Sequence, residues 1–174
     1  MAISLREVEK FVSDSLPRRL KRDLSGLKMI KEADLECCAY HHLRRFLRKD
    51  ANWDVFVRKH SLHTGHYIDL LLFRKGRPRV AIELKWNRSQ LSPKDRRSLR
   101  RALRLLRVNK AYFVTTLVAK SYREIQKTTV EKNRLFEIVI PLSLRGAELT
   151  TWKQTRRTFM SRMLRGKAPK KSAA

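Results

Sequence analysis

The sequence predicts an α/β domain in which helices flank a mixed sheet of four or five strands. Three observations predict it. Short apolar, β-prone segments alternate with longer segments whose apolar residues recur at helical spacing. The order of these segments is helix, three strands, helix and strand. The chain has 174 residues and 42% hydrophobic content, which is enough for one domain with a core.

The N-terminal part of the chain is predicted to be helical. Apolar residues recur at helical spacing from Leu5 to Val12, within an expected helical extension over residues 1–26. Pro17 follows that helix, and residues 18–22 are expected to form a basic connection. A longer helix is expected from about Leu27 to Lys49, at the start of a core that spans residues 27–141.

Three strands are expected next. Trp53 to Val57 alternates in polarity as a half-buried strand does. Tyr67 to Phe73 and Val80 to Trp86 are β-prone runs that are apolar on both sides, which is typical of central strands. We expect these two runs to form a hairpin whose loop consists of residues 75–77.

The second half of the core begins with a clear helix signal. Ser92 suits the N-cap and Pro93 suits the first helical position, so a helix is expected from there to about Arg107. The remaining elements are expected to be a strand from Ala111 to Thr116, a helix from Ala119 to Lys132, a strand from Leu135 to Pro141 and a helix between Leu149 and Leu164.

Positive charge dominates the composition. There are 42 Lys and Arg residues against 16 acidic residues, which leaves a net charge of +26 and a pI near 11.2. An excess on this scale implies a polyanionic partner, most simply DNA or RNA. The alternatives are a basic protein that binds nucleic acid only nonspecifically and a ribosomal-type protein. The basic C-terminal extension, residues 142–174, is expected to be partly helical or disordered.

The sequence also bears on the compartment of the protein. Its two cysteines, Cys37 and Cys38, are adjacent and do not suggest a structural disulfide, which favours a reducing compartment. No apolar run approaches the roughly 20 residues that a membrane span needs. We therefore expect no membrane association and a cytoplasmic or nucleoid-associated location.

Two carboxylates are predicted to face each other in the hairpin. With residues 75–77 as the loop, Asp69 lies opposite Glu83, with Cβ atoms about 5 Å apart on one face. Two carboxylates that close repel each other, and a divalent cation between them would relieve the repulsion. Lys85 points to the same face and could orient or activate an attacking water, and the backbone carbonyl of Leu84 is a further candidate ligand. The alternative is an ion pair between one acid and a lysine.

These residues carry a resemblance to a known family. Ile68-Asp69, thirteen intervening residues and Glu83-Leu84-Lys85 resemble the signature of the PD-(D/E)XK nuclease superfamily, with Ile68 where the family name has Pro. The order of elements from about Lys31 to Ile140 is similar to the restriction-endonuclease-like core of that superfamily, αβββαβ. The resemblance implies Mg²⁺-dependent hydrolysis of phosphodiester bonds, usually of DNA, with Mn²⁺ as a substitute.

Members of this superfamily often carry a further acid on the helix that precedes the sheet. The candidates here are Glu32 and Glu36. At 100° per residue, Glu32 projects near the centre of the apolar stripe of this helix and Glu36 nearer its edge. We therefore favour Glu32 as the additional catalytic and metal-binding residue, with Glu36 as the alternate. An ordinary acid near a helix N-terminus, which the helix dipole favours, is the alternative interpretation.

A basic ridge is expected on the helix after the hairpin. Its arginines recur at helical spacing on the side opposite the apolar stripe, which suits contact with phosphates. A solvated helix face that is rich in arginine is the alternative. The candidate nucleic-acid-binding residues are Lys94, Arg97, Arg100, Arg101, Arg104 and His66.

The favoured hypothesis is a Mg²⁺-dependent nuclease that acts on DNA, as an endonuclease. An RNA substrate is also conceivable. Two alternatives stay open. One is a structure-specific junction resolvase that works as a symmetric homodimer. The other is a basic nucleic-acid-binding module without catalytic activity.

Overall fold

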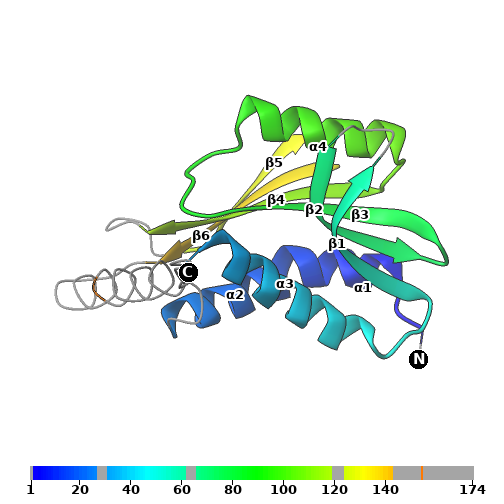
Figure 1. The fold of residues 1–174 in the computed structure, drawn as a ribbon, viewed down its shortest axis with the longest axis horizontal. Coiled ribbons are helices and arrows are strands. Elements are labelled where there is room, and N and C mark those ends of the chain that lie inside the picture. Colours follow the sequence, from blue (N-terminus) through cyan, green and yellow to red (C-terminus); the bar gives the residue numbers. More distant parts are fainter. Residues whose placement is uncertain (1, 27–30, 62–65, 119–123, 143–153, 155–174) are drawn as a thin grey trace, which may run out of the picture. The chain divides into compact units, whose positions relative to one another are not determined.

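Helices lie on both faces of a mixed sheet in the computed structural model of the protein (Figure 1). The structure describes residues 2–26, 31–61, 66–118, 124–142 and 154, without the side chains of residues 58–61 and 66. The helices are α1 (Leu5–Lys10), the π-helix η1 (Phe11–Ser15), α2 (Leu16–Ser25), α3 (Glu32–Leu47) and α4 (Pro93–Leu105). The strands are β1 (Trp53–Ser61), β2 (His66–Arg74), β3 (Arg77–Lys85), β4 (Lys110–Val118), β5 (Gln126–Glu131) and β6 (Leu135–Leu142).

The described residues form a six-stranded sheet with the order β1-β2-β3-β4-β6-β5. β1, β2 and β3 are antiparallel neighbours, whereas β4 pairs in parallel with both β3 and β6. α4 supplies the crossover between β3 and β4 that a parallel pair requires. The predicted α/β class with a mixed sheet is therefore confirmed, and the order from α3 to β4 is the predicted one.

The strand count is higher than predicted because the segment expected to be helical from Ala119 to Lys132 contains β5. β5 pairs antiparallel with β6 at one edge of the sheet. Thr128, Thr129 and Val130 are β-branched and favour a strand over a helix. Residues 119–123 of that prediction lie outside the described residues.

The N-terminal helical segment is longer than predicted. Ser4 caps α1, since its side chain accepts a hydrogen bond from the Glu7 backbone N–H at 3.2 Å. α1, η1 and α2 then follow one another without a break, so residues 18–22 are helical and not a connection. Pro17 lies in the first turn of α2. A proline cannot donate to the preceding turn, and the π-helical turn η1, with its wider hydrogen-bond spacing, lies directly before it.

The hairpin turn is shorter than predicted, yet the predicted register of the acids is kept. Lys75 and Gly76 form a two-residue turn with φ of 51° and 72°, as in a type I′ turn. A bulge on β3 then shifts the pairing by one residue, so that Leu70 pairs with Ile82. This is the register that a three-residue loop would have produced, and one step beyond its last described pair it would set Asp69 opposite Glu83.

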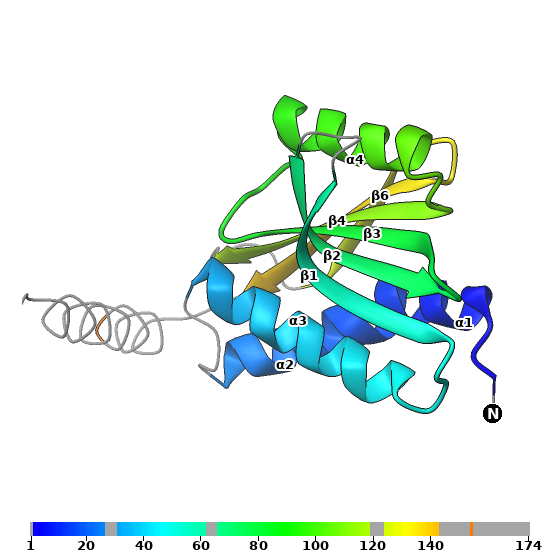
Figure 2. The same ribbon diagram turned by 45° about the vertical axis from the view of Figure 1, so that its right-hand side comes forward.

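The core lies between the sheet and the two groups of helices (Figure 2). α4 packs on β3 and β4, where Leu99 and Ala102 meet Ala81 and Phe113 in one buried cluster. On the other face α3 packs on β1, β2 and β3, and α2 packs on β6 and α3. β3 is therefore covered on both faces, as its apolar sequence predicted.

All the described residues except residue 154 belong to one compact unit. The predicted helix between Leu149 and Leu164 lies outside the described residues apart from residue 154. None of the helices in the described ranges is both long enough and apolar enough to cross a membrane.

Candidate active site

Three carboxylates surround one ammonium group where β3 ends. The Nζ atom of Lys85 lies 2.8 Å from Glu83 Oε1, 3.6 Å from Glu32 Oε1 and 3.7 Å from Asp69 Oδ2. Asp69 belongs to β2, Glu83 and Lys85 belong to β3, and Glu32 is the first residue of α3. The structure thus brings together four of the residues that the sequence singled out, from three elements.

Asp69 is held in place by the neighbouring strand. Its Oδ2 atom accepts a hydrogen bond of 2.8 Å from the backbone N–H of Leu84. This bond lies next to the point where the described pairing of β2 with β3 ends, at Leu70 and Ile82. The side chain of Asp69 is buried, so the bond also satisfies an oxygen that is shielded from water.

The two candidate acids on α3 differ in how they approach the site. Glu32 contacts it directly, because its Oε2 atom accepts from the Trp86 backbone N–H at 3.3 Å in addition to its ion pair with Lys85. The Glu32 side chain is 42% exposed, whereas Glu36 is only 6% exposed. Helical projection had placed Glu32 nearer the buried centre. Because Glu32 is the first residue of α3, it has helix neighbours on one side only. Its side chain is therefore more exposed to solvent than the projection predicted.

The environment of Asp69 disfavours its charged form. Burial raises the pKa of Asp69, and the negative charges of Glu36 and Glu32 act in the same direction. The hydrogen bond from Leu84 and the charge of Lys85 oppose this rise, but the pKa stays above its ordinary value. Both Glu32 and Glu36 therefore act electrostatically on Asp69.

Glu83 and Lys85 are shifted in a related way. Burial, followed by repulsion from Asp69, raises the pKa of Glu83 to about 7. Burial by itself would lower the pKa of Lys85, but its hydrogen bond to Glu83 and the surrounding carboxylates outweigh that effect and raise it. Lys85 is therefore an ammonium at neutral pH, while the Glu83 carboxyl is close to its titration point.

The oxygens of this site suit a hard divalent cation. Glu83 Oε2 is buried and has no hydrogen-bond partner among the described residues. A buried acceptor without a partner costs about 1–3 kcal/mol, which a cation would offset. The carbonyl oxygen of Leu84 accepts a hydrogen bond of 3.1 Å from Lys85 Nζ. The ammonium group thus contacts carboxylate and carbonyl oxygens, which are the kinds of oxygen that Mg²⁺ prefers as ligands.

The site as described is not a preformed metal cage. Within the described ranges, no three or more His, Cys, Asp or Glu side chains are gathered closely enough to hold a metal ion. The ammonium of Lys85 lies among the carboxylates and contacts Glu83 Oε1, so an ion that bound Glu83 Oε2 would share the site with it. The residues present fit Mg²⁺ by the chemistry of their oxygens and by the buried Glu83 Oε2 atom.

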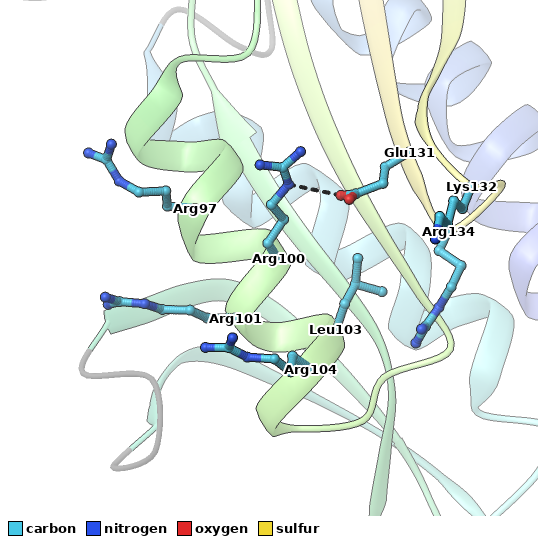
Figure 3. Close-up of a pocket in the computed structure, with 8 residues that line it drawn as sticks. All are labelled: Arg97, Arg100, Arg101, Leu103, Arg104, Glu131, Lys132 and Arg134. Atoms are coloured by element: carbon cyan, nitrogen blue, oxygen red, sulfur yellow. Dashed lines mark hydrogen bonds and ion pairs between the residues drawn. The ribbon is translucent and has the colours of Figure 1, made fainter.

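The basic candidates form a separate cluster. Four of the five predicted basic residues of α4 line one pocket, which Figure 3 shows, and Lys94 is exposed elsewhere on the helix. The same pocket is lined by Lys132 and Arg134, which the sequence analysis missed because it assigned residues 119–132 to a helix. Asn133, a turn-prone residue between two β-prone segments, was the available signal. The side chain of His66 lies outside the described part of the structure.

No known protein-family model matches the chain, and no curated protein matches it either. The function must therefore be inferred from the residues of the site and from the charge around it.

Proposed function

We propose that the protein is a Mg²⁺-dependent nuclease of the PD-(D/E)XK type that hydrolyses phosphodiester bonds of DNA, as an endonuclease. One observation carries the proposal. Lys85 Nζ lies within 3.7 Å of three carboxylates from β2, β3 and α3. A site with acids, a lysine and a buried carboxylate oxygen that lacks a partner matches the chemical needs of metal-assisted phosphodiester hydrolysis.

Asp69, Glu83, Glu32 and the backbone carbonyl of Leu84 would hold the metal ion, with Glu36 beside them. When bound, Mg²⁺ or its substitute Mn²⁺ supplies a Lewis acid for the phosphoryl oxygen and lowers the pKa of a bound water. The hydrogen bond from Leu84 N–H keeps Asp69 turned toward this position. Trp86 N–H does the same for Glu32.

Lys85 acts as a hydrogen-bond donor in this proposal. In the metal-free protein the surrounding carboxylates raise the pKa of Lys85, so its Nζ atom keeps its proton at neutral pH. The ammonium can orient an attacking water and stabilise the negative charge that develops on the phosphate.

The charge of the protein supports a polyanionic substrate. The net charge is +26, and the exposed arginines of α4 lie in the layer that packs on β3, the strand that carries Glu83 and Lys85. Electrostatic attraction of this kind brings nucleic acid to a site without selecting its sequence.

The proposal predicts metal-dependent nicking of a supercoiled plasmid. Asp69→Asn, Glu83→Gln and Lys85→Met should each lower the rate by about a hundredfold or more, because each removes a charge that acts on the transition state. Asp14→Asn is the matched control, since Asp14 is a partly exposed acid whose described ion pair is with Lys127, outside this site. Gel analysis of nicked and linear plasmid measures the rates.

A second measurement separates a metal site from a general loss of structure. Titration calorimetry with Mn²⁺ should detect binding to the wild type and to Asp14→Asn, and weaker binding to Glu83→Gln. DNA binding without cleavage under any metal would contradict the nuclease and favour the non-catalytic module. Cleavage of a four-way junction in preference to linear DNA, by a dimer in sedimentation analysis, would favour the resolvase alternative.

A further inference from the structure

A cationic groove lies between α4 and the turn that joins β5 to β6 (Figure 3). We call it the α4–β6 groove. Its cationic lining residues are Arg97, Arg100, Arg101, Arg104, Lys132 and Arg134. Leu103 contributes an apolar part of the lining, and Glu131 is the one acid among the described residues that line it.

Two of these side chains are held in fixed orientations. Arg134 donates from Nη2 to the Val108 carbonyl at 2.9 Å and from Nε to the Asn109 carbonyl at 3.3 Å. Arg100 points across the groove and donates from Nε to Glu131 Oε2 at 2.9 Å (Figure 3). A guanidinium has five N–H donors, so each of these arginines keeps donors for a further acceptor.

The charge in the groove is unfavourable for the protein alone. On α4, Arg97 is separated from Arg101, and Arg100 from Arg104, by one helical turn. Like charges at this spacing destabilise a helix. Six cations and one acid, Glu131, line the groove. An anion bound in the groove would relieve this repulsion.

The position of the groove relative to the acids follows from the strand register. Leu135 pairs with Ala111, and Ala111 pairs with Ala81, which is two residues before Glu83. Arg134 is therefore displaced from Glu83 by about 10 Å along the strands and by about 10 Å across two strand spacings. The backbones of the two sites are thus roughly 14 Å apart.

We propose that the α4–β6 groove binds backbone phosphates of the nucleic acid, roughly 14 Å from the bond that the acids would cleave. The distance from the cleaved bond rests on the proposed nuclease function, whereas phosphate binding in the groove does not. Arginine suits this role because its planar fork of N–H groups matches two phosphate oxygens. The groove would position the strand and would not read its sequence.

Binding of a fluorescein-labelled DNA duplex in EDTA, followed by fluorescence anisotropy over a series of salt concentrations, tests the groove without cleavage. Replacing Lys132 and Arg134 by Gln together should weaken binding several-fold. It should also reduce the slope of log Kd against log salt by about two, since each lost phosphate contact removes about 0.9. The matched control replaces Arg44 and Arg48 by Gln, which removes the same charge from the C-terminal end of α3 and its C-cap.

A second variant guards against misfolding. Arg134 is bonded to backbone carbonyls, so its loss can disturb the turn. The double variant Arg97→Gln with Lys132→Gln leaves those bonds intact and should change the slope by the same amount. Equal slope changes in the α3 control, or an unchanged slope in both groove variants, would overturn the proposal.

The outcomes for the groove and for the nuclease can be told apart. If the wild type nicks plasmid and the groove variants bind with an unchanged slope, the nuclease stands and the groove fails. If no metal supports nicking but the slope falls as expected, the groove stands and the nuclease fails. If both stand, the groove variants should raise KM for DNA and leave kcat unchanged.

Discussion

Burial of the ionised Glu83 side chain lowers the stability of the folded protein. Burial and the charge of Asp69 raise its pKa from the ordinary 4.5 to about 7. Between these values the folded protein binds more protons than the unfolded chain, so stability is complete below about pH 4.5 and falls as the pH rises through 7. At 1.36 kcal/mol per pKa unit the loss is on the order of 3 kcal/mol. The raised pKa of Asp69 acts in the same direction.

Glu83→Gln should therefore stabilise the metal-free protein above neutral pH. In EDTA, its melting temperature should exceed that of the wild type at about pH 8 and approach it at about pH 4, where Glu83 is protonated in both states. Thermal unfolding followed by circular dichroism measures the difference, with Asp14→Asn as the control. A variant that is destabilised equally at both pH values would show that the pair of Glu83 with Lys85 stabilises more than burial costs.

The hairpin of β2 and β3 is the element that brings Asp69 and Glu83 together. The bulge compensates for the short two-residue turn. As a result Leu70 pairs with Ile82, and the two acids are the next residues along the two strands. Gly76 has a positive φ of 72°, where an L side chain is strained, while a Cβ there would meet no described heavy atom within 4 Å. The cost of a side chain at Gly76 is therefore one of backbone conformation.

Gly76→Ala should lower the free energy of unfolding by about 1–2 kcal/mol, which is the cost of the left-handed conformation for an L residue. Chemical denaturation measures it. Lys75→Asn is the companion variant, because Lys75 also has a positive φ, of 51°, and asparagine tolerates that region better. Lys75→Asn should keep or raise stability. A loss larger than about 3 kcal/mol for Gly76→Ala would mean that the turn supports more than its own backbone.

The whole molecule carries far more positive than negative charge. Besides the α4–β6 groove, Arg74, Lys75, Arg77 and Arg79 gather at the hairpin turn, and His41, Arg44, Arg45 and Arg48 gather on α3. With a net charge of +26, repulsion between these groups opposes the compact state. Salt screens such repulsion, because the Debye length falls from about 30 Å at 0.01 M to about 10 Å at 0.1 M.

The melting temperature should therefore rise with NaCl concentration, and a short polyanion such as heparin should raise it further at constant salt. Differential scanning fluorimetry measures both effects. A neutral osmolyte at matched osmolality is the control for effects of solvent exclusion. A melting temperature that falls with added NaCl would mean that ion pairs, such as Lys110 with Glu9, outweigh the repulsion.

The structure also shows which features were predictable from local sequence. The facing of Asp69 and Glu83 was predictable because both lie within one hairpin, where the turn and the alternation of side chains set the register. α4 was predictable from Ser92 and Pro93 at its start. β5 was predicted as a helix, because its residues are largely exposed at the edge of the sheet and show little apolar alternation.

The sequence by itself determined the α/β class, the hairpin with its two acids and lysine, and the excess of positive charge. Only the tertiary structure decided that Glu32 contacts Lys85 while Glu36 is buried beside them, and that Arg134 shares a groove with the arginines of α4. The physical reason is distance along the chain. Register within a hairpin is set by neighbouring residues, whereas contacts between α3 and β3, or between α4 and β6, form only once the strand order has brought distant segments together.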